Sequence, residues 1–203
     1  MKPATDSDFW NQRFLEPGWA YGTEPNDFLK AQAGHIPMGE VLCLAEGEGR
    51  NAVHLAALGY AVSAMDFSST GLAKAQALAL ERGVNIHTFV ADLGAFDPGE
   101  GRWQGIVSIF VHPLTTLRRA LHQHMVRALA PGGVILLEAY ATNQLKLGTG
   151  GPREPERLCS LEDLTEDFAG LETMICHELE RDVQEGKYHR GTSAVLQFMG
   201  RKP

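Results

Sequence analysis

Cysteine is scarce in this chain of 203 residues, which holds only Cys43, Cys159 and Cys176, far apart in the sequence. A disulfide framework or a zinc site needs more cysteines at closer spacing. The sequence therefore predicts no disulfides and no metal centre, and it favours the reducing cytoplasm as the location of the protein.

Long apolar runs and an excess of basic residues are also missing. No stretch approaches the roughly 18 apolar residues of a membrane-spanning helix, and the first ten residues lack the apolar segment of a secretory signal. The net charge is −7, and lysine and arginine are dispersed, whereas nucleic-acid binders gather them. We therefore expect neither a membrane nor a nucleic acid as partner, and we expect a monomer or homodimer.

Short apolar runs alternate with amphipathic stretches along the chain, a pattern typical of α/β folds. We predict a Rossmann-like, doubly wound, mostly parallel seven-stranded sheet with a C-terminal antiparallel hairpin. The predicted strands are Val41–Ala45, Ala61–Met65, Ile86–Ala91, Gly105–Phe110, Val134–Ala139, Thr173–Asp182 and Thr192–Arg201.

The length fits a single domain over residues 1–203. Within it we expect an N-terminal helical cover, residues 1–38, and a Rossmann-like core, residues 39–203. Asp6 or Ser7 is the predicted cap of a first short helix, and Asn26 that of a second.

Three local patterns describe the second half of the chain. Pro131-Gly132-Gly133 is predicted to end a helix over about Leu114 to Leu129. The stretch from Leu147 to Pro155 is rich in glycine and proline, so we expect a mobile cover without regular structure. Ser160-x-x-Asp163 resembles a capping box at a helix start.

Ligands of open α/β sheets bind beyond the carboxyl ends of the strands, where the strand order reverses. Gly47 and Gly49 form the turn after the first predicted strand, and Asp92 follows the third. Asp66 lies 21 residues beyond Ala45, a spacing typical of a carboxylate that binds a ribose diol.

The glycine turn alone leaves the ligand open. Gly47-x-Gly49-x-x-Ala52 also fits the dinucleotide fingerprint, so a nicotinamide-dependent oxidoreductase is one hypothesis. Glu46 and Glu48 flank the turn, however, and would repel a pyrophosphate. S-adenosylmethionine carries a sulfonium, an ammonium and one carboxylate, so acidic flanks favour it.

The segment from Val41 to Leu58 resembles the first motif of class I S-adenosylmethionine-dependent methyltransferases, and the spacing of Asp66, Asp92 and Pro131-Gly132-Gly133 also matches that family. The start, Phe9-Trp10-x-x-Arg13-Phe14 through Tyr21-Gly22-Thr23-Glu24-Pro25-Asn26, resembles the tellurite-resistance and thiopurine methyltransferase-like branch. The resemblance covers nearly the whole chain. It implies S-adenosylmethionine as cofactor, S-adenosylhomocysteine as product and a small-molecule substrate.

The resemblance also implies a set of cofactor-binding residues. Asp66 would bind the ribose, Asp92 would approach the adenine amino group, and Phe67 would pack against the adenine. Trp19 and Tyr21 are either core anchors or aromatic faces near the sulfonium. The full predicted set is Trp19, Tyr21, Ala45, Glu46, Gly47, Gly49, Arg50, Asn51, Asp66, Phe67, Ser68, Asp92, Leu93 and Ile109.

This chain departs from the family pattern at its first strand. Cys43 stands where the family usually has an acidic residue, Ala45 replaces the first glycine of the loop, and Glu46 replaces a small residue or cysteine. A non-catalytic protein that binds S-adenosylmethionine is therefore a further hypothesis. In the catalytic alternative, Glu46 supplies the displaced carboxylate for the ammonium of the ligand.

The strand ends carry no carboxylate pair and no nucleophile–base pair. The apolar run Ile109-Phe110-Val111 beside His112 predicts a mostly apolar pocket for a small, easily ionised acceptor, such as a thiol or a metalloid species. His112 and His189 are the candidate catalytic bases, since imidazole takes up protons near neutral pH. Helix capping by His112 and an exposed turn at His189 are the alternatives.

Overall fold

A computed structural model describes residues 7–203. The helices are α1 (Ser7–Leu15), α2 (Asp27–Gln32), α3 (Arg50–Ala57), α4 (Ser69–Glu81), α5 (Thr115–Ala128) and α6 (Leu161–Asp167). Short 3-10 turns lie at Ala33–His35, Thr142–Lys146 and Pro155–Arg157. The strands are β1 (Glu40–Leu44), β2 (Ala61–Asp66), β3 (His87–Val90), β4 (Trp103–Ile109), β5 (Leu129–Tyr140), β6 (Glu172–Glu185) and β7 (His189–Arg201).

All seven strands form one sheet in the order β3-β2-β1-β4-β5-β7-β6. The first five strands pair in parallel, and β7 runs antiparallel to both β5 and β6. This confirms the predicted fold class. The strand order reverses between β1 and β4, which is where such sheets bind ligands.

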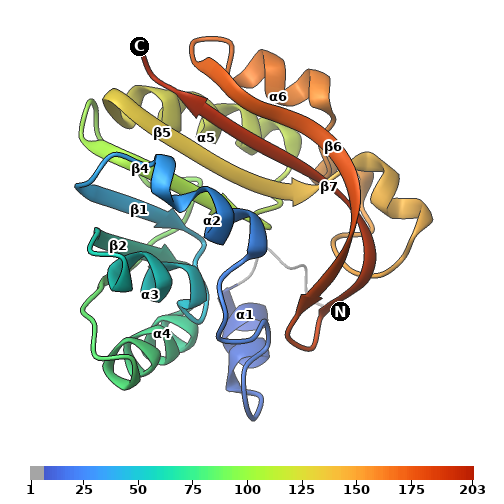
Figure 1. Ribbon diagram of the computed structural model, residues 1–203. Coiled ribbons are helices and arrows are strands. Elements are labelled where there is room, and N and C mark those ends of the chain that lie inside the picture. Colours follow the sequence, from blue (N-terminus) through green and yellow to red (C-terminus); the bar gives the residue numbers. More distant parts are fainter. Residues whose placement is uncertain (1–6) are drawn as a thin grey trace.

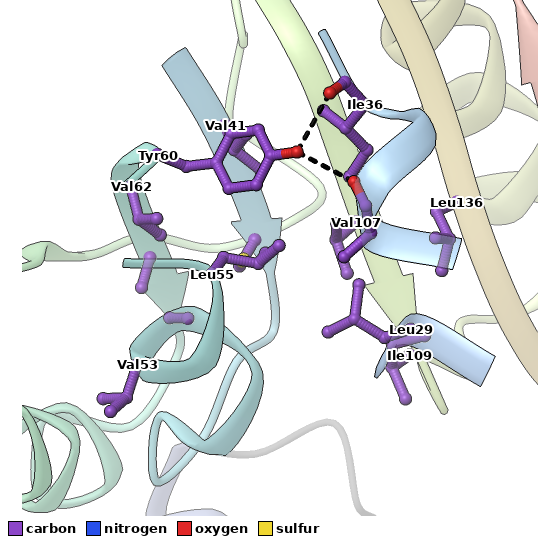
Figure 2. Packing of buried hydrophobic residues seen from close by; sticks show 14 of the residues in the cluster. Leu29, Ile36, Val41, Val53, Leu55, Tyr60, Val62, Val107, Ile109 and Leu136 are labelled. Carbon is purple, nitrogen blue, oxygen red and sulfur yellow. Dashed lines mark hydrogen bonds between the residues drawn. The ribbon is translucent and has the colours of Figure 1, made fainter. Parts of the chain in front are cut away.

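Helices cover both faces of the sheet (Figure 1). Apolar side chains of α2, α3 and α4 form a core on one face, and those of α5 and α6 form a core on the other. Tyr60 closes the first core, packed near Val41 and Leu55, and its hydroxyl lies 2.8 Å from the Ala33 carbonyl and 2.9 Å from that of Ile36 (Figure 2). The tyrosine thereby ties the segment after α2 to the sheet.

Side chains at the N-cap positions cap three helices, and the caps at Asn26 and Ser160 are the predicted ones. The side chains of Asn26 and Ser68 accept hydrogen bonds at the starts of α2 and α4. Ser160 and Asp163 form the predicted capping box of α6. Helix α1 begins at Ser7, and Asp6 lies outside the described residues.

We expect Ser160→Ala to lower the free energy of unfolding by about 1 kcal/mol, because the amide of Asp163 loses its side-chain acceptor. Urea denaturation measures this change. Ser160→Thr keeps a hydroxyl and should retain most of the stability. Equal losses in the two variants would contradict a capping role.

Helix α5 ends at Ala128, close to the predicted end at about Leu129. Strand β5 begins at Leu129 and not at the predicted Val134, so Pro131-Gly132-Gly133 lies inside the strand. Backbone bonds join Gly132 and Gly133 to Lys202, so the end of the chain extends the strand around these residues.

The C-terminal hairpin is longer than predicted, because pairing continues to Glu185 and His189. Its tip bends back to the N-terminal segment (Figure 1), where the Lys187 amide donates to the Ala20 carbonyl at 2.8 Å. His189 is therefore the first residue of β7, and the expectation of an exposed turn there was wrong.

The stretch between the two 3-10 turns, residues 148–154, has no helix or strand, as predicted. Among residues 7–203, no helix combines the length and apolar character required to cross a bilayer.

Candidate active site

The turn after β1 is fastened to the end of β2 by backbone and side-chain bonds. The Glu46 amide donates to the Met65 carbonyl at 3.0 Å, and the Gly47 amide donates to Asp66 Oδ2 at 2.8 Å. Ala45 has a φ of +46°, a left-handed conformation that residues other than glycine rarely adopt. This fixed, strained turn lies at the point where the strand order reverses.

Asp66 ends β2 as a buried carboxylate. Its Oδ1 accepts from the Ser68 amide at 2.7 Å and its Oδ2 from the Gly47 amide at 2.8 Å. Burial raises the pKa of this carboxyl group, whereas the bonds from backbone amides oppose that rise. The two bonds fix the rotamer and leave further lone pairs on both oxygens.

The side chain of Glu46 caps the N-terminus of α3. Its Oε1 accepts from the amides of Asn51 and Ala52 at 2.9 and 2.8 Å, which satisfies two donors that a helix start leaves open. Burial raises the pKa of Glu46 to about 7, despite these bonds and the charge of Arg50. Within residues 7–203 no hydrogen bond engages Oε2 of this carboxylate.

A cavity of about 640 Å³ lies over these strand ends, within the usual range of small-molecule sites. Most of the residues predicted from the sequence line it. Those residues are Tyr21, Ala45, Glu46, Gly47, Arg50, Asn51, Asp66, Phe67, Asp92, Leu93, Ile109, His112 and His189.

Three predicted residues, Trp19, Gly49 and Ser68, do not line the cavity. Trp19 packs against the core of the α2–α4 face, with the Lys74 ammonium 5.7 Å from its ring centroid. Ser68 is fully buried and caps α4. Gly49 is the N-cap residue of α3 and has a φ of +88°, and an added Cβ would lie 2.5 Å from the Cβ of Ala75. These three support the walls of the site.

The sequence analysis predicted a helical cover over residues 1–38 but named no side chain of α1 as a site residue. Phe9, Trp10, Arg13 and Phe14 all line the cavity. The sequence shows that this segment is aromatic. Its periodicity does not show where on the sheet a helix at the start of the chain packs. Arg157, from the 3-10 turn before α6, also went unnoticed, because nothing in its sequence neighbourhood marks it.

The two predicted histidines have unusual surroundings. Nε2 of His112 and Nδ1 of His189 are buried without a hydrogen-bond partner in the described part of the chain. Burial lowers the pKa of His112 to about 4. Burial and the charge of Arg50 lower the pKa of His189 well below its usual value. Both imidazoles are therefore neutral near pH 7, with an open donor or acceptor at the cavity.

Arg50 connects the cavity wall to a buried ionic network. Its Nη2 lies 2.5 Å from Glu185 Oε2, and Nη1 is buried without a hydrogen-bond partner among residues 7–203. Glu185 in turn pairs with Arg181, which also binds the fully buried Glu138. The side-chain Nδ2 of Asn26 donates to both Glu138 and Glu185. The network ties β5, β6 and α2 to the start of α3.

Charge is distributed unevenly around the cavity. The carboxylates of Glu46, Asp66 and Asp92 gather at the ends of β1, β2 and β3. Arg13 lies on α1, Arg157 in the 3-10 turn before α6, and the two histidines in the loop after β4 and at the start of β7. One end of the cavity is thus acidic and the other basic and aromatic.

Two comparisons of the sequence with known proteins found methyltransferases. Residues 41–133 match the methyltransferase domain family. A 2-heptyl-1-hydroxyquinolin-4(1H)-one methyltransferase of Mycobacteroides abscessus is 32% identical over 151 residues, which span 71% of this chain and 66% of that protein.

Solved structures share the fold. One of them was solved for the conversion of a disulfide bond into a thioacetal group during echinomycin biosynthesis. It superposes with a TM-score of 0.76 at 22% identity, over 97% of this chain and 89% of that one. TehB from Haemophilus influenzae superposes with a TM-score of 0.71 at 20% identity, over 97% of this chain and 67% of that one. The domain match, the curated relative and the fold together identify this chain as a member of the class I S-adenosylmethionine-dependent methyltransferases.

Proposed function

We propose that the acidic end of the cavity holds S-adenosylmethionine, through the residues predicted from the sequence. Asp66 would accept hydrogen bonds from the ribose diol, and Asp92, Phe67 and Leu93 would surround the adenine. The free Oε2 of Glu46 would face the ammonium. The carboxylates at this end complement a ligand with a sulfonium and an ammonium, and they would repel a dinucleotide pyrophosphate.

When bound, S-adenosylmethionine supplies an activated methyl group: the acceptor atom bonds to the methyl carbon, the carbon–sulfur bond breaks, and its electron pair stays on sulfur. The protein contributes position and desolvation. The apolar wall at Ile109 and Phe110 excludes water from the acceptor, and the strained turn at Ala45 fixes the floor of the site.

For the acceptor we propose a small molecule that ionises readily near neutral pH. The supporting observation is the state of the two histidines, which are neutral and unpartnered at the cavity. Thiols and metalloid species, the acceptors of the tellurite-resistance and thiopurine-like branch, meet this condition. Acidic aromatic hydroxyl compounds meet it too, and they are favoured by the aromatic wall and by the relative that acts on a hydroxyquinolone.

The test is a screen with tritiated S-adenosylmethionine against thiols, selenium and tellurium oxyanions, acidic aromatic hydroxyl compounds and aliphatic amines. The proposal expects label on the ionisable acceptors. Label on the amines alone would contradict it.

His112 is proposed to orient the acceptor, because an imidazole with a pKa of about 4 takes up a proton poorly near pH 7, contrary to the base predicted from the sequence. We expect His112→Ala to lower turnover at least tenfold, because the buried Nε2 is removed, and to leave the affinity for S-adenosylhomocysteine within about twofold. Initial rates and calorimetry measure the two quantities. The variant His124→Ala, on α5 and away from the cavity lining, is the matched control. Unchanged turnover in His112→Ala would exclude the proposed role.

We also propose a cytoplasmic location, a monomer or homodimer, and a single domain in which residues 1–38 act as the cover. All three cysteines are free, which is consistent with a reducing compartment. Fractionation and sedimentation measure location and mass.

A further inference from the structure

We propose that Arg13 is the specificity-determining residue for the acceptor and that it binds an aromatic anion, such as an ionised phenol or N-hydroxy heteroaromatic compound. This inference rests on the proposed function and names the substrate class of the same site. Three observations support it: Arg13 lines the cavity, it forms no ion pair among residues 7–203, and aromatic rings surround it.

Arg13 lies on α1 at the wall of the cavity. Its guanidinium carbon is 3.8 Å from the ring centroid of Tyr188 and 5.1 Å from that of Phe9. Nη1 lies 3.5 Å from the hydroxyl of Tyr21. A guanidinium stacked on a ring keeps its in-plane N–H groups directed away from the stack, so they are available to a ligand.

Tyr188, in the hairpin tip, is fixed from the outside of the site. Its hydroxyl donates to the carboxylate of Glu16, at 2.6 and 2.7 Å from the two oxygens, and the neighbouring Lys187 is bonded to the backbone at Pro17. These bonds hold the ring against Arg13 between α1 and the tip of the hairpin. The guanidinium therefore has a defined orientation without any ligand.

Arg13 differs in its charge balance from Arg50 and Arg181, the arginines of the buried network. Arg50 and Arg181 are paired with Glu185, and Arg181 also with Glu138. Arg13 forms no ion pair with any carboxylate of residues 7–203, and the same holds for Arg157. Glu154 also lines the cavity but forms no ion pair with either guanidinium, so an anion bound here would balance positive charge that no ion pair among residues 7–203 compensates.

His189 adds an unpartnered polar atom and a ring to the wall of the same cavity. Its buried Nδ1 has no partner in the described chain, and its ring centroid lies 4.6 Å from those of Tyr21 and Phe110. A neutral imidazole offers one hydrogen bond to a ligand oxygen. The rings of Phe9, Tyr21, Phe110 and Tyr188 favour a flat aromatic body for the anion.

Two pairs of probes separate charge from shape. 4-Nitrophenol is an acidic phenol, and 4-nitroanisole is its neutral methyl ether. 2-Heptyl-1-hydroxyquinolin-4(1H)-one and its methyl ether form a larger pair. Calorimetry measures the binding of each probe to protein saturated with S-adenosylhomocysteine, for the parent, Arg13→Gln and Arg13→Lys.

We expect the parent to bind at least one hydroxyl probe more tightly than its ether, and more tightly as pH rises through the pKa of the probe. Arg13→Gln should weaken the binding of that anion about 10- to 100-fold, the effect of losing a charged hydrogen bond, and should change the affinity for the ether less than threefold. Arg13→Lys keeps the charge but not the planar fork, so its loss should be intermediate. Arg82→Gln, at an exposed surface arginine, is the control for net charge.

The inference is overturned if Arg13→Gln binds the anions as the parent does, or if neither anion binds the parent better than its ether. In both cases S-adenosylhomocysteine still binds and the proposed function stands. If the parent does not bind S-adenosylhomocysteine at all, the proposed function itself fails.

Discussion

Gly49→Ala is expected to lower the free energy of unfolding by about 2–5 kcal/mol. The new side chain strains a left-handed backbone conformation and also overpacks the contact with α4. Gly49 has a φ of +88°, and an added Cβ would lie 2.5 Å from Cβ and 2.7 Å from Cα of Ala75 on α4. The backbone of that helix has little freedom to retreat. Helices α3 and α4 would have to separate, and the turn that lines the cavity would move with them.

Gly83 provides the matched control for this substitution. Its φ is +68°, and nothing lies within 4 Å of an added Cβ. Gly83→Ala therefore adds the backbone strain alone, about 1 kcal/mol. Urea denaturation of both variants measures the difference. If Gly49→Ala is no less stable than Gly83→Ala, the close packing of the turn on α4 is wrong.

The affinity for S-adenosylmethionine is expected to fall about tenfold from pH 8 to pH 6, because Glu46 must be ionised to attract the ammonium of the ligand. Burial raises the pKa of Glu46 to about 7, so about nine tenths of this group is ionised at pH 8 and about one tenth at pH 6. A cationic ligand favours the ionised form, so binding releases a proton and the affinity rises with pH.

Glu46→Gln keeps an oxygen to cap α3 but carries no charge. Its affinity should be lower than that of the parent at pH 8, and it should lose the part of the pH dependence that Glu46 causes. Calorimetry at both pH values measures the dissociation constants. Glu24→Gln removes the charge of an exposed carboxylate and serves as the control. Equal pH profiles for the parent and Glu46→Gln would contradict the ammonium contact.

The strand ends could be predicted from sequence because their signals are local. The apolar run before Gly47 and the spacing to Asp66 follow from the geometry of a strand, a turn and a helix, and both residues line the cavity. The capping box at Ser160 is equally local.

The other half of the site depends on contacts between distant segments. Pairing of Glu185 with His189 extends the hairpin, and its tip is held by the Ala20 carbonyl, far away in the sequence. No periodicity within the hairpin reports such a contact. For the same reason the sequence did not predict Arg13 as a site residue, since its orientation depends on Tyr188, 175 positions later in the chain.

The central claim is that the cavity over β1, β2 and β4 binds the adenosyl cofactor, and calorimetric titration with S-adenosylhomocysteine tests it most directly. NAD titrated in parallel tests the competing ligand, and Asp66→Asn keeps the size of the side chain but removes its charge. We predict saturable binding of S-adenosylhomocysteine by the parent, binding about tenfold or more weaker in Asp66→Asn, and no binding of NAD. Binding of NAD in preference to S-adenosylhomocysteine, or equal affinities of the parent and Asp66→Asn, would contradict this account.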